Sequence, residues 1–127
     1  MIRETDHIFV YLARHSDVGL TLEPGKYELK AFSDASWESR HSTSGWVVYW
    51  QGAAISWGSR KQDCVALSSC EAEIIALSEA SKEMVFFRKL VGGLDPSFVS
   101  GPTSLATDNT GARDLSYNPE HHNRTKH

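Results

Sequence analysis

The chain has 127 residues, of which 40% are hydrophobic and 23% are charged, as in a globular domain with a core of its own. Its net charge of −3 argues against a strongly basic nucleic-acid binder, although the distribution of charge matters more than the total. No apolar run has the length of a membrane span, and acidic residues and histidine interrupt the N-terminal stretch, so we expect no membrane contact and no secretory signal. The two cysteines, Cys64 and Cys70, have no metal-binding spacing and fit a reducing, intracellular compartment.

The N-terminal part of the chain predicts one helix and one strand. Residues 5–15 have apolar side chains at helical spacing, and residues 16–24 form a connector with weak strand character. After the turn signal Pro24-Gly25, residues 27–34 alternate and predict a strand that ends at Asp34. We expect residues 1–25 to belong to a preceding segment and residues 26–127 to form the domain.

Two further strands follow a polar loop. Residues 45–50 are a continuous apolar run, which predicts a strand buried on both faces. Residues 53–57 return after the turn Gln51-Gly52, so the two strands are expected to form a hairpin.

The longest helical pattern covers residues 65–91. Its stripe at spacings of four and three consists of Glu73, Leu77, Ala80, Met84, Phe87 and Val91. Ser68 and Glu71 fit the Ser-x-x-Glu capping box at the start of the helix. Glu71 and Glu73 point about 200° apart, so Glu71 has a structural explanation while Glu73 faces the body of the protein. An inward carboxylate needs a metal, a donor or a basic partner, and the helix alone does not choose between metal binding and an ion pair with Arg or Lys.

The last expected elements are a short strand over residues 103–107 and a helix over residues 109–117. The order strand, strand, strand, helix, strand, helix predicts an α/β fold with a mixed sheet. A right-handed crossover would place the first and fourth strands side by side, which would bring Asp34 and Asp108 together with Glu73 above them. Three carboxylates in one cleft favour a hard divalent cation, Mg²⁺ or Mn²⁺, and a pair of such ions suits phosphodiester hydrolysis.

Other polar and aromatic residues are weaker candidates. Short polar side chains that could bind phosphate or 2′-hydroxyl groups, or simply cap helices, are Ser36, Ser68, Ser69 and Asn109. Three tryptophans lie on expected core strands, namely Trp46, Trp50 and Trp57, whereas Trp37 lies in a loop on the expected substrate side. The tail histidines His121, His122 and His127 are expected to be solvated rather than metal-bound.

Three sequence blocks resemble the motifs of a ribonuclease H domain. They are FSDAS with Asp34, SSCEAEIIALSEA with Glu73, and TDNTGA with Asp108. More narrowly, the chain resembles the version of this domain fused to reverse transcriptase in copia-type LTR retrotransposons. Further matches to that subfamily are Ser42-Thr43-Ser44-Gly45, Ile55-Ser56-Trp57, Lys61-Gln62, Val65-Ala66-Leu67-Ser68-Ser69 and Arg124-Thr125-Lys126-His127, and Tyr11-Leu12 with Gly19-Leu20 resembles the end of the reverse transcriptase connection.

The resemblance implies a function. The family cleaves the RNA strand of an RNA–DNA hybrid with two metal ions, and by motif Asp34, Glu73 and Asp108 would be the catalytic metal ligands for Mg²⁺ or Mn²⁺. The implied partners are the hybrid and a reverse transcriptase domain of the same polyprotein, in a cytoplasmic particle or the nucleus.

One departure from the family pattern lies at the end of the chain. The family carries a fourth carboxylate on a C-terminal helix, after one further strand, and this sequence ends at His127 before both. We therefore expect a ribonuclease H-like domain without its final strand and helix, with weak or no nuclease activity. The alternative is a non-enzymatic remnant that keeps the fold, with weak or no hybrid binding.

Overall fold

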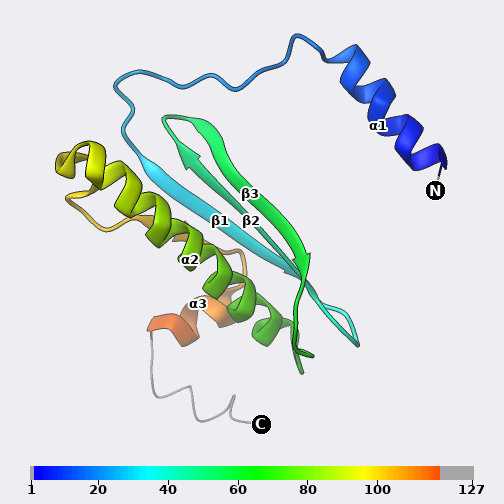
Figure 1. The fold of residues 1–127 in the computed structure, drawn as a ribbon. Coiled ribbons are helices and arrows are strands. Elements are labelled where there is room, and N and C mark those ends of the chain that lie inside the picture. The colour runs from blue at the N-terminus through cyan, green and yellow to red at the C-terminus, as the bar shows by residue number, and fades with distance from the viewer. Residues whose placement is uncertain (1, 118–127) are drawn as a thin grey trace.

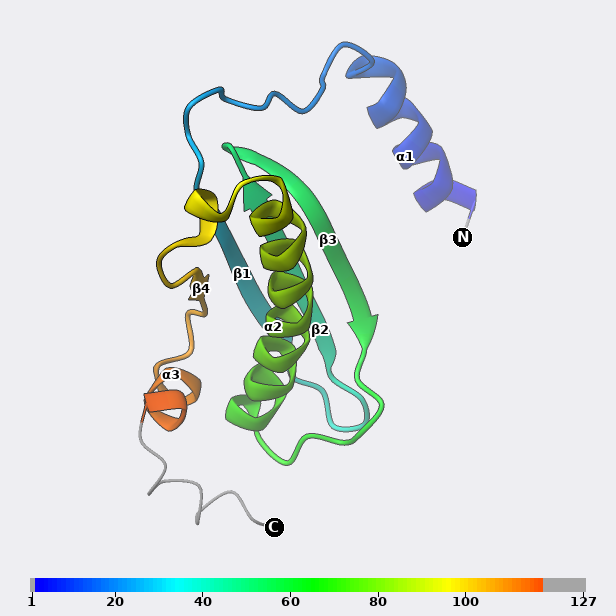
Figure 2. The same cartoon turned by 60° about the vertical axis from the view of Figure 1, so that its left-hand side comes forward.

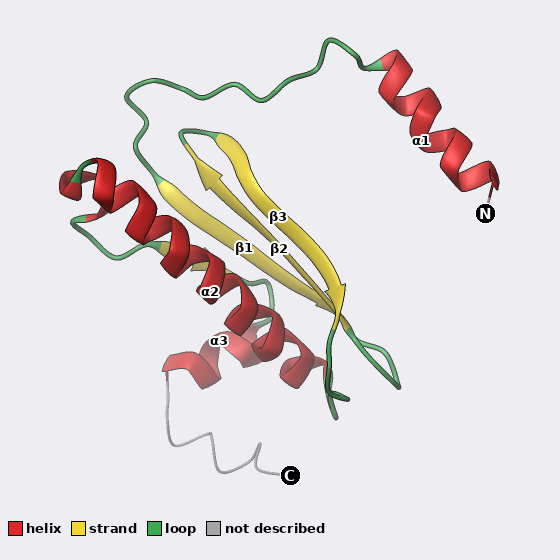
Figure 3. Ribbon diagram, viewed as in Figure 1, coloured by secondary structure: helices red, strands yellow, loops and turns green. Residues whose placement is uncertain are grey.

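The computed structural model describes residues 2–117 and contains one sheet with helices beside it (Figure 1; coloured by element type in Figure 3). In chain order the elements are α1 (Ile2–Arg14), β1 (Leu29–Ser36), β2 (Thr43–Trp50), β3 (Ala53–Lys61), α2 (Ser69–Leu94), a 3₁₀ helix η1 (Pro96–Val99), β4 (Ser104–Ala106) and α3 (Thr110–Tyr117). The predicted order of strands and helices from residue 27 onward is confirmed.

The sheet is mixed, with the strand order β3-β2-β1-β4. β1 pairs antiparallel with β2, and β2 pairs antiparallel with β3 through the tight turn at Gln51 and Gly52, both of which have positive φ. β4 returns after α2 and pairs parallel with β1. The predicted neighbours, the first and fourth strands, are therefore side by side, and the predicted α/β class with a mixed sheet is confirmed.

α2 lies along one face of the sheet, over β1 and β2 (Figure 2). β1 alternates, with Leu29, Ala31 and Ser33 buried beneath the helix and Phe32 and Asp34 exposed. The core cluster contains Leu29, Ala31 and Val48 of the sheet and Met84 of α2. The helix approaches the sheet through small side chains, because Ala72, Ala76 and Ala80 are fully buried. The predicted stripe thus faces the core, with Leu77 and Phe87 half-buried.

β2 corrects the expectation of a strand buried on both faces. Only Ser44 and Val48 of this strand are buried, because α2 covers a single face of the sheet. For the same reason Trp57, expected in the core, is 68% exposed. Trp46 and Trp50 do pack against the core cluster.

α2 runs past residue 91, where the helical pattern of the sequence ends. Gly92 and Gly93 lie inside the helix, which ends at Leu94. Asp95 is extended, and it precedes Pro96, which disfavours the helical conformation of the residue before it. The proline therefore ends the helix, and the Asp95 side chain accepts from the Ser97 amide 2.8 Å away to begin η1.

The N-terminal segment lies apart from the sheet. All residues from 4 to 28 are exposed, and α1 is joined to β1 by a long extended connector (Figures 1 and 2). The weak strand character expected for residues 16–24 is not realised, since none of these residues is in a strand. The first link to the sheet is the Glu23 amide, which donates to the Gln51 carbonyl at 2.8 Å.

Candidate metal centre

Three carboxylates converge at one end of the sheet. Asp34 lies near the end of β1, Glu73 in the second turn of α2, and Asp108 just after β4. One oxygen of each carboxylate lies within 4.8 Å of an oxygen of the other two. The predicted convergence is therefore present, and it is a geometry that a single divalent cation could bridge.

The pairing between β1 and β4 ends close to the point where the carboxylates meet. The last pair between β1 and β4 is Phe32 with Ala106, and Thr107 and Asp108 continue beyond the strand. Asp34 is on the exposed face of β1, whereas Glu73 comes from the helix on the other face. Because β4 ends after Ala106, the inward side chain of Glu73 can reach Asp34 and Asp108 past the last strand pair. An open hollow of about 370 Å³, lined by Phe32, Ser33, Asp34, Ala106, Thr107 and Asp108, adjoins this point.

Glu73 is the buried member of the trio. It is 6% exposed, whereas Asp34 and Asp108 are exposed. Burial raises the pKa of the Glu73 carboxyl above its ordinary value, and the negative charges of Asp34 and Asp108 raise it further, while the Ala35 backbone amide opposes the rise. Its Oε2 atom is buried and accepts no hydrogen bond within the described part of the chain. An unpaired buried carboxylate oxygen is costly, so the site favours a bound cation.

The alternative of an ion pair at Glu73 is not what the structure shows. Among residues 2–117, no lysine or arginine forms a salt bridge with Asp34, Glu73 or Asp108. All the ligand atoms that the cluster offers are carboxylate oxygens. Such a ligand set suits Mg²⁺ and Mn²⁺ better than it suits zinc. The residues therefore fit a hard divalent cation.

Glu71 has the separate structural task expected of it. Ser68 is the N-cap of α2, and its hydroxyl accepts from the Glu71 amide at 3.1 Å. The Glu71 carboxylate turns back and accepts from the Leu67 amide at 2.7 Å, one residue before the cap. The two acids of this turn thus have different roles. Glu71 stabilises the start of the helix, and Glu73 belongs to the carboxylate cluster.

The four short polar candidates are distributed around the site. Ser36 ends β1 and is exposed, and Ser69 is exposed at the start of α2. Ser68 and Asn109 are engaged as caps, since the Asn109 side chain accepts from the Ala112 amide at 2.9 Å at the start of α3. Their binding to substrate remains a prediction.

Trp37 lies in the loop after β1, as expected. It is 52% exposed, and its indole N–H donates to the Ala66 carbonyl at 3.1 Å, which ties this loop to the segment before α2. The tail histidines His121, His122 and His127 lie outside the described residues.

The sequence analysis matched Gln62 to the subfamily but predicted no structural role for this residue beside the site. Gln62 follows β3 and is 3% exposed, and its side chain contacts Ser44 and the Ala72 carbonyl. A lone glutamine after a strand has the pattern of a solvated loop residue, so no periodicity could have predicted its burial.

Comparison with known proteins finds relatives among transposon polyproteins. The chain is 38% identical over 122 residues to the "Retrovirus-related Pol polyprotein from transposon RE2" of Arabidopsis thaliana, a match that covers 92% of this chain and 8% of that protein. It is 39% identical over 103 residues to the corresponding protein "from transposon TNT 1-94" of Nicotiana tabacum, covering 78% of this chain and 8% of that protein. The chain thus spans about 8% of the length of these relatives.

Other comparisons add less. A "Secreted RxLR effector protein 161" of Plasmopara viticola is 46% identical over 81 residues, which cover 60% of this chain and 57% of that protein. The crystal structure of RNase H1 from the archaeon Halobacterium salinarum NRC-1 is similar with a TM-score of 0.45 and 16% identity, over 68% of this chain and 89% of that one, a level too low to support an argument. No family model matches the chain.

Proposed function

We propose that the chain is the ribonuclease H domain of a copia-type retrotransposon Pol polyprotein and that it hydrolyses the RNA strand of an RNA–DNA hybrid; its 38–39% identity to Pol polyproteins from transposons supports this. The observation that carries the proposal is the convergence of Asp34, Glu73 and Asp108 within 4.8 Å, with no basic partner for them among residues 2–117. Each acid lies within one of the motif blocks that resemble this family. No helix within the described residues is long and apolar enough to cross a membrane.

Asp34, Glu73 and Asp108 are proposed to hold the divalent cations, two of Mg²⁺ or Mn²⁺. When bound, such ions supply positive charge for the attacking and leaving oxygens of a phosphodiester. Glu73 must lose its proton to serve as a ligand, and burial of its carboxyl opposes that loss. The two aspartates lie on the exposed side, so they would present the site to a nucleic acid while Glu73 closes it from the helix side.

The proposed substrate contacts come from residues beside the carboxylates. Ser36 and Ser69 have exposed hydroxyls that could bind phosphate or the 2′-hydroxyl group that distinguishes RNA from DNA. Ser68 and Asn109 would contribute only with their remaining hydrogen-bonding capacity, since each already caps a helix. We propose residues 1–25 as a connection to a reverse transcriptase domain of the same polyprotein, in an intracellular particle or the nucleus.

The proposal is tested by cleavage of an RNA–DNA hybrid whose RNA strand is end-labelled, with double-stranded RNA and double-stranded DNA as substrate controls. We expect weak, Mg²⁺-dependent cleavage, and only of the RNA strand in the hybrid. Glu73→Gln should lower the rate about 100-fold or more, because it removes a charged ligand at the reacting phosphate.

Glu71→Gln is the matched control two residues away. A glutamine oxygen can still accept from the Leu67 amide, so this variant should cleave at close to the normal rate. An equal loss from both substitutions would contradict the division of roles. No cleavage by the parent chain, despite cation binding at the carboxylates, would favour the non-enzymatic alternative.

A further inference from the structure

We infer that Gln62 is a positioning residue for the carboxylate cluster, because its side-chain amide fixes the backbone that carries Glu73 relative to the strand pair that carries Asp34. This inference rests on the proposed function, since it concerns the metal affinity of the same site. Gln62 itself is not one of the clustered carboxylates.

Both backbone polar groups of Gln62 have hydrogen-bonding partners. Its amide donates to the Ser42 carbonyl at 2.8 Å, and its own carbonyl oxygen lies 3.0 Å from Nδ1 of His41. Ser42 is fully buried, and its hydroxyl accepts from the Glu38 amide at 3.2 Å. The base of the Gln62 side chain is therefore anchored to the loop between β1 and β2 before the side chain reaches the helix.

The Gln62 side chain then joins the helix to the sheet with a single group. Nε2 donates to the Ser44 hydroxyl at 2.9 Å and to the Ala72 carbonyl at 2.9 Å. A carbonyl oxygen only accepts, so the NH₂ end of the amide must face Ala72.

One acceptor precedes Glu73 in the sequence, and the other lies on the strand that pairs with the Asp34 strand. The Ala72 carbonyl belongs to the peptide group that ends at the nitrogen of Glu73. Ser44 adjoins Gly45, which is the cross-strand partner of Asp34. One NH₂ group thus links the peptide group before Glu73 to a serine hydroxyl on β2, the strand that pairs with the Asp34 strand. A peptide plane is rigid, so moving the Ala72 carbonyl moves Glu73.

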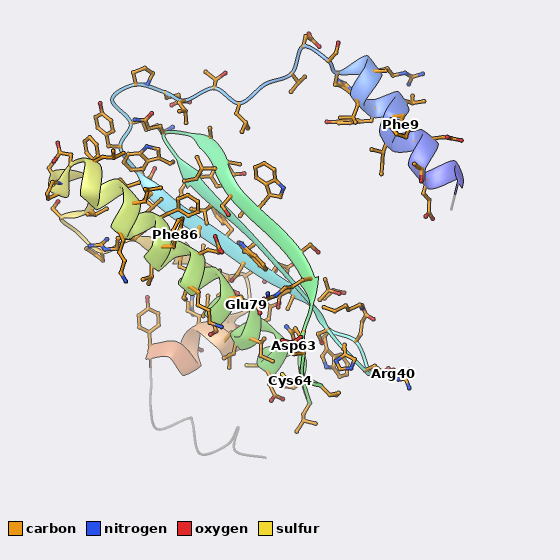
Figure 4. The ribbon with its side chains drawn as sticks, viewed as in Figure 1. Phe9, Arg40, Asp63, Cys64, Glu79 and Phe86 are labelled. Atoms are coloured by element: carbon orange, nitrogen blue, oxygen red, sulfur yellow. The ribbon has the colours of Figure 1, made fainter. Side chains whose placement is uncertain are left out.

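Apart from the contacts of the Glu73 carboxyl itself with Ala35 and Asp34, the other side-chain links from the sheet to α2 lie farther along the helix. Within the described part of the chain, they are the Ser56 hydroxyl to Glu83, at 3.2 Å, and Arg60 to Glu79, whose side chain lies between α2 and β3 in Figure 4. Neither is in the turn that contains Glu73. Because metal ligands must be held to within about 0.5 Å, the tie at Gln62 should affect metal affinity more than the ties beyond it.

The test compares Gln62→Met with Ser56→Ala in the full 127-residue chain. Methionine keeps an unbranched side chain of similar length but has no N–H donor, and the Ser56 variant removes an equivalent tie to α2 that lies away from Glu73. Binding of Mn²⁺, which takes the same oxygen ligands as Mg²⁺, is followed by the electron paramagnetic resonance signal of the free ion. Urea unfolding of each variant reports its stability separately.

We expect Gln62→Met to weaken Mn²⁺ binding about tenfold, as loss of a supporting group around a metal site typically does, and Ser56→Ala to change it less than about twofold. If Gln62→Met does not fold, Ser44→Ala removes one of the two acceptors and should weaken binding by roughly two- to fourfold. Normal binding in the Gln62 variant, or in the Ser44 variant if that one is used, would overturn the inference, as would an equal loss in the Ser56 variant. If the parent chain does not bind Mn²⁺, or if the Glu73→Gln variant still binds it, the result would instead contradict the proposed function.

Discussion

Glu73 combines burial, repulsion from two neighbouring acids and an unpaired oxygen in one side chain. Burial raises the pKa of its carboxyl, and the charges of Asp34 and Asp108 and a side-chain hydrogen bond with Asp34 raise it further. Burial raises the pKa of the nearby Cys70 thiol, and the charge of Glu73 raises it further. Without a cation, the site is therefore a source of instability rather than of stability.

A pH dependence follows from this raised pKa. As pH rises, the unfolded chain loses the Glu73 proton at the ordinary glutamate pKa, while the folded chain keeps it to a higher pH. Between the two values the folded state binds more protons, so the free energy of unfolding falls as pH rises through this window. Glu73→Gln should remove this fall, so the variant should become more stable than the parent as pH rises above the ordinary glutamate pKa.

The measurement is urea unfolding of both proteins at pH 4, 5, 6 and 7 in the presence of a chelator. The stability difference between Glu73→Gln and the parent should grow with pH, whereas Glu71→Gln should show no such growth, because Glu71 lies outside the cluster. A difference that is constant across this range would contradict the buried, repelled state of Glu73.

The sequence predicted the roles of some residues of the site but not of others. Glu73 was separated from Glu71 by helical geometry alone, because the two side chains point in nearly opposite directions. The burial of Gln62 could not be predicted in the same way. It depends on three segments that are distant in the chain, the loop after β1, the end of β3 and the start of α2.

At the scale of elements, the close fit between β2 and β3 depends on a glycine. A Cβ atom added at Gly58 would lie 2.2 Å from the Trp46 ring, which packs over this position on the side facing α2. Trp46 in turn contacts the core cluster, and the Arg60 guanidinium lies 6.0 Å from its ring centre. The strand pair therefore has no room for a side chain at residue 58.

Gly58→Ala should destabilise the fold by about 1–3 kcal/mol, because the Trp46 ring must leave its place. Gly45→Ala is the matched control in the neighbouring strand, where the nearest atom to an added Cβ is the Asp34 carbonyl oxygen at an ordinary 3.7 Å. Chemical denaturation monitored by tryptophan fluorescence measures both. Equal stability of the two variants would show that Trp46 does not pack against residue 58 in this way.

Element boundaries were less predictable than element types. The amphipathic stripe gave the correct face of α2, since helix periodicity is local information. The helical pattern ends at residue 91, before Gly92 and Gly93, whereas the helix continues through both glycines and ends before Pro96. The exposure of Trp57 depends on which face of the sheet α2 covers, and strand patterning of residues 53–57 does not contain that information.

At the scale of the whole molecule, α1 and its connector contribute little to the packed body. Phe9 on α1 lies far from the sheet in Figure 4, and every residue from 4 to 28 is exposed. Among the described residues, this segment first contacts the packed body at Glu23, whose amide donates to the Gln51 carbonyl. The next contact is at Tyr27, whose ring stacks on Phe98 with centroids 4.3 Å apart. We therefore propose that the domain begins close to residue 23 rather than at 26.

Deletion of residues 1–20 should change the free energy of unfolding by less than about 0.5 kcal/mol, as for surface changes that remove no packed contact. Deletion of residues 1–25 also removes the Glu23 hydrogen bond and should cost about 1 kcal/mol. Thermal and urea unfolding of the two shortened chains measures the difference. A large loss from the shorter deletion would mean that α1 packs on the domain.

The most direct measurement is anomalous diffraction from crystals of the chain soaked in Mn²⁺. The account predicts a peak bonded to oxygens of Asp34, Glu73 and Asp108 together, at about 2.0–2.2 Å as for a small divalent cation, and no peak there in Glu73→Gln crystals. Ordered Mn²⁺ bound elsewhere with this cluster empty, or a peak that persists without the Glu73 carboxylate, would contradict it.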